Sequence, residues 1–164
     1  MRKALGSILL VLVTGYLEAQ PASRLSKKAL ELVSVDAPVV ALVDVQVVDG
    51  TGGPPKAAQT VVIDNGRIKA VGPVADVAIP AEAKRLELQG HTVIPGIVGM
   101  HNHTFYTTSA RESQMNVTSP RLYLASGVTT IRTTGSFSPY SEINLKRSIE
   151  NGEIAGPRIA AALC

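Results

Sequence analysis

The chain has 164 residues, of which 45% are hydrophobic and 18% are charged, and this composition indicates a globular rather than a disordered protein. The formal net charge of +3 is too small to indicate a nucleic-acid partner. Cys164 is the single cysteine, which excludes an internal disulfide and a cysteine metal site. Aromatic residues make up only 4%, so the core must be aliphatic.

Residues 1–19 have the pattern of a secretory signal peptide. Arg2 and Lys3 precede the apolar run "ALGSILLVLVTGYL", and cleavage is expected after Ala19. As a helix, about 14 residues span roughly 21 Å, whereas a bilayer core is about 30 Å thick. We therefore expect an exported protein, periplasmic or extracellular, without a permanent membrane span. A buried apolar helix is the alternative interpretation.

Residues 20–38 are polar and mixed, which predicts a linker with a short helix in "SKKALELV". Residues 39–94 then predict a small antiparallel β unit. In "VVALVDVQVV" valines alternate with polar residues, which indicates a half-buried strand. Asn65-Gly66 predicts a tight hairpin because both residues accept positive φ, and Gln89-Gly90 predicts a second turn.

Residues 95–164 predict parallel βαβ units. Strand-like and helix-like stretches alternate there, in the order "IVGMHNH", "SPRLYLAS", "VTTIRTT", "SPYSEINLKRSIENG" and "PRIAAAL". Three parallel strands do not close a barrel, so this second domain is expected to be incomplete in the chain.

The most informative stretch is "IPGIVGMHNHTF", which contains His101 and His103. Side chains at positions i and i+2 of a strand share a face, so both imidazoles can approach one metal ion, with Asn102 pointing the other way. Two hydrogen-bonded polar residues at a strand end are the alternative. The position at the carboxyl end of a strand that opens a βαβ series favours a site, and Gly96 and Gly99 allow close backbone approach.

In order along the chain, "VVDGTGGPPKAAQTVVIDNGRIKAVG", "LQGHTVIPGIVGMHNH", "GVTTIRTTGS" and "IENGEIAGPRI" resemble the amidohydrolase superfamily. The resemblance covers about residues 40–160 and is strongest to the imidazolonepropionase-like and Xaa-Pro-dipeptidase-like branch. It implies an α/β fold: the start of a (β/α)8 TIM barrel over residues 95–164, preceded by a small antiparallel β-sandwich over residues 39–94.

The resemblance also implies a chemistry, the hydrolysis of amide-like carbon–nitrogen bonds of a small-molecule substrate. His101 and His103 match the two metal ligands of the first barrel strand, for one or two divalent ions, most often zinc. Such an ion lowers the pKa of water toward about 7. The chain departs from the family pattern at Gly99 and Thr133, where an Asp is common.

The ligand inventory after His103 is incomplete. No further His or Asp follows, and the remaining carboxylates are Glu112, Glu142, Glu150 and Glu153. The resemblance implies that the rest of the site, including the catalytic carboxylate, lies on later strands beyond Cys164, and two imidazoles alone are fewer than the three protein ligands usual for catalytic zinc. A catalytically inactive remnant with a folding or binding role is the first alternative, and a lactone or other ester hydrolase is the second.

Three other polar residues have weaker patterns. His91 lies in "QGHTV" and is expected in a turn or on the surface. Arg121 and Arg132 could bind an acidic group of a substrate, but solvated arginines are the simpler interpretation.

Overall fold

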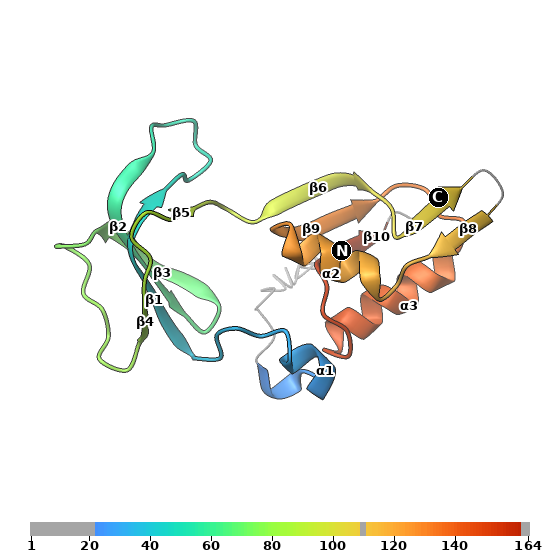
Figure 1. Ribbon diagram of the computed structural model, residues 1–164, viewed down its shortest axis with the longest axis horizontal. Coiled ribbons are helices and arrows are strands. Elements are labelled where there is room, and N and C mark those ends of the chain that lie inside the picture. Colours follow the sequence, from blue (N-terminus) through green and yellow to red (C-terminus); the bar gives the residue numbers. More distant parts are fainter. Residues whose placement is uncertain (1–21, 109–110, 162–164) are drawn as a thin grey trace, which may run out of the picture.

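The computed structural model describes residues 22–108 and 111–161, so the predicted signal peptide and Cys164 lie outside the described residues. Two β-sheets lie toward opposite ends of the long axis of the molecule, and helices accompany only the second of them (Figure 1). The N-terminal segment contributes η1 (Ala22–Arg24) and α1 (Lys27–Leu30), and α1 is the short helix expected in this region.

The first sheet is formed by β1 (Val39–Val47), β2 (Lys56–Asp64), β3 (Arg67–Pro73), β4 (Lys84–Glu87) and β5 (Thr92–Val93). The second region contains β6 (Ile97–Asn102), β7 (Phe105–Thr108), β8 (Arg111–Gln114), α2 (Thr118–Ala125), β9 (Val128–Thr133), α3 (Pro139–Glu150) and β10 (Arg158–Ala161).

The first sheet has the strand order β3-β2-β1-β4, and β5 also pairs with β1. The hairpin between β2 and β3 is confirmed: Asn65 and Gly66 have φ of 47° and 73° and connect the pair Asp64 and Arg67. The expectation of a wholly antiparallel unit is wrong, because β4 and β5 both pair with β1 in parallel. The stretch between β3 and β4 carries the chain back along the sheet, so β4 enters in the direction of β1.

The predicted alternation of β1 is confirmed, but its valines face two cores rather than one. Between Leu42 and Val45 the pairing with β2 shifts, and Asp44 has φ of 56° in this irregularity. Val43 packs with Val62, whereas Val45 packs with Val61, the next residue along β2 and therefore on its other face. The bulge thus distributes the buried residues of β1 over both faces of the sheet.

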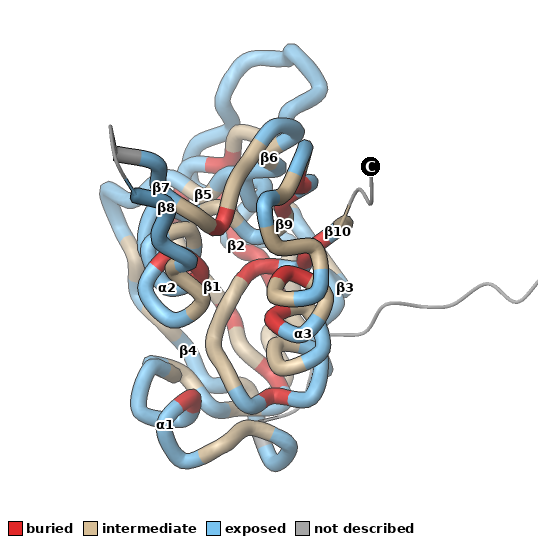
Figure 2. The backbone as a smooth tube through the Cα atoms, turned by 90° about the vertical axis from the view of Figure 1, so that its right-hand side faces the viewer, coloured by how far each residue is buried: buried red, intermediate tan, exposed pale blue. Residues whose placement is uncertain are grey.

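The second sheet has the order β10-β9-β6 with all pairs parallel, as the alternating pattern predicts. Ile131 of β9, Ile159 of β10 and Leu145 of α3 form its buried core, and Tyr123 of α2 packs against them. Both helices therefore cover the same face of this sheet. In Figure 2 one group of buried residues accordingly lies where α3 meets the strands of this sheet.

Two features were not predicted. β7 and β8 form an antiparallel hairpin between β6 and α2. The N-terminal segment docks on the turn after α3, where the Ser26 amide donates to the Gly152 carbonyl at 2.8 Å and the Ser26 hydroxyl donates to the Glu153 carbonyl at 2.9 Å. Among the described helices, none has the length and apolar character needed to cross a membrane.

Candidate functional site

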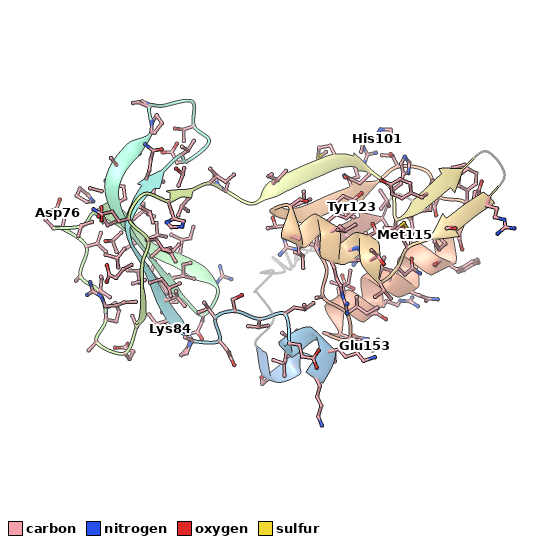
Figure 3. All side chains as sticks on the ribbon, in the orientation of Figure 1. Asp76, Lys84, His101, Met115, Tyr123 and Glu153 are labelled. Atoms are coloured by element: carbon pink, nitrogen blue, oxygen red, sulfur yellow. The ribbon has the colours of Figure 1, made fainter. Side chains whose placement is uncertain are left out.

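His101 and His103 lie together at the carboxyl end of β6, as predicted. Their ring centroids are 5.2 Å apart and the rings are nearly perpendicular, at 79°. His101 is exposed and His103 is half-buried. In Figure 3 His101 projects from the end of β6 on the side away from the helices.

A second β-bulge explains this orientation. Gly99 pairs with Ile131 and Asn102 pairs with Thr133, so β6 has one residue more than β9 between these two pairs. Ile131 and Thr133 are both buried on the helix-covered face, so Gly99 and Asn102 also belong to that face. The extra residue places His101 and His103 on the open face, which the sequence did not predict, and leaves Asn102 on the other face, which it did.

Glycine is required at two positions of this segment because neighbouring side chains occupy the space of a Cβ. A Cβ on Gly99 would lie 2.3 Å from the Asn102 Nδ2 atom. A Cβ on Gly96 would lie 2.3 Å from the Thr129 Oγ1 atom. Both glycines thus have the close-approach role that the sequence predicts, and Gly99 makes room for the side chain that separates the two histidines.

Hydrogen bonds to two helices hold the turn that follows β6. The Tyr123 hydroxyl of α2 donates to the His103 carbonyl at 3.0 Å. The Thr104 hydroxyl donates to the Glu142 carboxylate of α3 at 3.3 Å, and both side chains are almost fully buried. The sequence identified Glu142 only as a remaining carboxylate, and the structure assigns it to the support of this turn.

Six buried polar side-chain atoms have no hydrogen-bond partner among the described residues, and all of them except Thr60 Oγ1 of β2 belong to the second region. Those of the second region are His103 Nδ1, Asn102 Nδ2 and Thr133 Oγ1, and also Thr134 Oγ1 and Asn116 Oδ1. Most buried polar groups in folded proteins have a partner, so such a group of orphaned atoms calls for an explanation. These atoms lie at the carboxyl ends of β6 and β9, or in the segments that follow, which is where active sites form in parallel α/β folds.

Two phenylalanines extend the site beyond the histidines. The His103 and Phe105 ring centroids are 4.8 Å apart, and the Phe105 and Phe137 centroids are 4.9 Å apart. Sequence reasoning missed these residues. The available signal was that both phenylalanines of an aromatic-poor chain follow closely after a strand of the βαβ series.

The weaker candidates separate in space. Arg132 is exposed on β9, and strand alternation from buried Ile131 and Thr133 places it on the open face with the histidines. Arg121 lies elsewhere, at a cavity of about 710 Å³ lined mainly by apolar residues of the N-terminal segment, α2 and the region after α3. His91 sits at the turn between β4 and β5, with its Nδ1 atom 3.3 Å from the Gln89 carbonyl oxygen.

The described residues contain no group of three or more His, Cys, Asp or Glu side chains placed to hold a metal ion. The two imidazoles thus have no third such side chain beside them in the described part of the chain. His103 Nδ1 is buried and has no hydrogen-bond partner among the described residues.

No family model matches the chain, and no curated protein matches it. Solved structures do match. A candidate prolidase from Bifidobacterium longum is 36% identical, with a TM-score of 0.63 over 77% of this chain and 30% of that protein. A Xaa-Pro dipeptidase with methionine bound in its active site is 27% identical, with a TM-score of 0.64 over 76% of this chain and 33% of that protein.

A molinate hydrolase is 25% identical, with a TM-score of 0.65 over 77% of this chain and 30% of that protein. The chain thus spans about a third of the length of the proteins that it matches. All three are members of the amidohydrolase superfamily, which confirms the resemblance seen in the sequence. By these similarities, the chain belongs to the amidohydrolase superfamily.

Proposed function

We propose that the protein is a metal-dependent hydrolase of carbon–nitrogen bonds and that His101 and His103 are two of its metal ligands. The observation that carries this proposal is the pair of adjacent imidazoles on the open face of a parallel sheet, one with an orphaned buried nitrogen. Similarity to a candidate prolidase and a Xaa-Pro dipeptidase supports amide or peptide bonds of small molecules as the substrate class.

The proposal includes an architecture. Residues 95–164 would form the first βα units of a (β/α)8 barrel, and residues 39–94 would contribute to a β-sandwich beside it. The parallel order β10-β9-β6 supports the first part, because consecutive strands of such a barrel are neighbours. In that arrangement the open face of the sheet is the barrel interior, and the two histidines point into it.

The donor set suits zinc or a similar divalent ion, for which neutral imidazole nitrogen is a common ligand. Two imidazoles are fewer than the three protein ligands usual in catalytic zinc sites, so the remaining ligands would come from outside the described residues. When bound, the ion would supply Lewis acidity that makes water a nucleophile near neutral pH.

The chain's own residues position the pair. Tyr123 holds the His103 carbonyl, and Thr104 on Glu142 holds the turn immediately after it. Tyr123 and Glu142 both belong to helices that pack against the core of the sheet. The backbone that carries the two imidazoles is therefore fixed relative to that core. We also propose that residues 1–19 direct export, so that the metal would be acquired in the periplasm or outside the cell.

Metal content tests the proposal. The purified chain is incubated with zinc, freed of excess ion and measured by elemental analysis beside two variants. We expect bound zinc in the wild type, loss of most of that zinc in the His101→Ala/His103→Ala double variant, and no change in His91→Ala. His91→Ala is the matched control, since this variant also loses an exposed imidazole, but from the first sheet.

Equal zinc binding by the wild type and the double variant would disprove the ligand roles. Hydrolysis is tested separately, with dipeptides and N-acyl amino acids as substrates for the metal-loaded protein. Zinc binding that depends on both histidines but brings no hydrolysis of any amide would favour the alternative of a non-catalytic chain.

A further inference from the structure

The rings of His101, His103, Phe105 and Phe137 form one continuous series. Successive ring centroids are separated by 5.2, 4.8 and 4.9 Å. Phe105 belongs to β7 and Phe137 to the stretch between β9 and α3, so two separate segments after β6 and β9 converge on this series. We refer to Phe105 and Phe137 together as the aromatic wall.

The aromatic wall does not belong to a hydrophobic core. Phe137 is 64% exposed, and neither phenylalanine is a member of the core around Ile131. Burying a phenylalanine is one of the larger sources of stability available to a small domain, so an exposed one forgoes much of that gain. The chain has only two phenylalanines and no tryptophan, and both phenylalanines stand beside the histidine pair.

We infer that the aromatic wall binds an aromatic or branched apolar side group of the substrate while the adjacent histidines serve the reacting carbonyl. The inference rests on the proposed function and extends it to substrate specificity. The wall begins at Phe105, one ring contact of 4.8 Å from His103, so a side group attached close to the reacting carbonyl would meet it.

The edge-to-face arrangement of the wall supports this assignment. Phe105 and Phe137 meet at 78°, and His103 and Phe105 are tilted by 49°. Edge-to-face contact leaves the face of at least one ring open to a further ring or an alkyl group, which is a favoured contact for a phenylalanine. The aromatic wall would select substrates with an apolar side group through apolar contact, and it would not require a charge on that side group.

Ligand binding without metal tests the aromatic wall independently of catalysis. N-acetyl-phenylalaninamide and N-acetyl-alaninamide are titrated into the metal-free chain, and their dissociation constants are measured by saturation-transfer NMR. The two ligands share the amide groups and differ only in the side group. We expect the wild type to bind the phenylalanine derivative about tenfold more tightly, which corresponds to about 1.4 kcal/mol.

Variants at exposed positions then test whether the preference for the phenylalanine derivative depends on the aromatic wall. Phe137→Ala should lower it by about threefold to tenfold, and Phe137→Leu should keep part of it, since leucine retains apolar contact. Tyr140→Ala is the matched control: Tyr140 is 82% exposed at the start of α3 and makes no ring contact with the series among the described residues. This control should bind both ligands like the wild type.

Equal affinities for the two ligands in the wild type, or a preference unchanged in Phe137→Ala and Phe137→Leu, would overturn the aromatic wall. Hydrolysis of amides with no preference for an aromatic side group would leave the proposed function intact and also contradict the wall. A ring preference that depends on Phe137 without any hydrolysis would support the wall and count against the hydrolase.

Discussion

The two sheets each contain a β-bulge, but the bulges have different consequences. β1 and β6 each contain a bulge that changes the face on which the following residues lie. In β1 both faces are covered, and the bulge sends Val43 into one apolar cluster and Val45 into the other. In β6 only one face is covered by helices, and the bulge sends two histidines to the other face.

The two bulges differ in the side chains that follow them. Beyond the β1 bulge, Val45 and Val47 are aliphatic and buried in an apolar cluster. The side chains beyond the β6 bulge are polar or aromatic and are partly exposed, with orphaned atoms. The first sheet is therefore a structural unit in the described residues, and the second combines a core on one face with the candidate site on the other.

The largest expected effect tests whether the two regions are separate units of stability. Ile131 is fully buried in the core of the second sheet. Ile131→Ala should lower the free energy of unfolding of that region by about 2–5 kcal/mol, because it removes apolar contacts and leaves a cavity. Urea titration followed by tyrosine fluorescence measures this, since all tyrosines of the described residues lie in the second region.

The control for this experiment is Val45→Ala, at a fully buried position of the first sheet. In a Tyr16→Phe background, it should shift the circular dichroism transition and leave the tyrosine transition in place. Equal shifts of both transitions by either substitution would show that the two sheets unfold as one cooperative unit.

An intermediate loss of stability is expected from Gly99→Ala, a substitution within the β6 bulge. The new Cβ would meet the Asn102 side chain, so we expect a loss of about 1–3 kcal/mol from overpacking. Since Asn102 stands between the histidines, its displacement should also weaken zinc binding. Thermal unfolding and zinc titration are the two measurements.

Asn102→Ala in the same chain should restore most of the stability lost through Gly99→Ala, because it removes the atoms that clash. The double-variant cycle then gives a coupling between the two positions. Strictly additive effects of the two substitutions would contradict the close packing of Asn102 over Gly99.

The smallest effect concerns a surface carboxylate of the first region. Asp49 accepts hydrogen bonds from the Thr51 hydroxyl at 2.6 Å and from the Lys56 ammonium at 2.9 Å. These contacts, that of Thr51 first, hold the Asp49 pKa well below its ordinary value of 3.8. A lowered pKa stabilises the fold above the ordinary pKa, and the contribution is lost as the pH falls toward the folded value.

Asp49→Asn should therefore lower the stability slightly at pH 7, and the difference from the wild type should shrink as the pH falls below the ordinary value. Because the pair of Asp49 and Lys56 is solvent-exposed, the effect should also weaken in high salt. Urea titrations at neutral and acidic pH, each at two salt concentrations, measure it. A difference that grows in acid would contradict the lowered pKa.

Patterns local to the chain predicted much of this structure. Alternating valines gave β1, Asn65-Gly66 gave the hairpin, and the succession of strand and helix patterns gave the parallel second sheet. The bulge of β1 escaped prediction because an unbroken apolar alternation carries no mark of a change of face, and that of β6 because its short sequence has no alternation for a bulge to interrupt. Similarly, the contact of Phe105 with Phe137 joins segments far apart in the sequence, and periodicity does not report such contacts.

The site was predicted only in part for the same physical reason. The spacing of His101 and His103 indicated a shared face, which the ring distance confirms, but their face depends on the bulge. Glu142 lies beside Ile143 in a helix whose apolar pattern does not distinguish a buried carboxylate from an exposed one. Its hydrogen bond with Thr104 forms only because α3 packs against the turn that contains Thr104, and local sequence does not report that packing.

The contact between Ser26 and Gly152 has a consequence for the order in which the protein folds. A ribosome makes the chain from its N-terminus, so Ser26 is synthesised long before the turn that receives it. Until α3 and its following turn have emerged, the N-terminal segment has no docking site and stays accessible. The export signal that we propose for residues 1–19 would therefore meet no competition from the native fold at that stage.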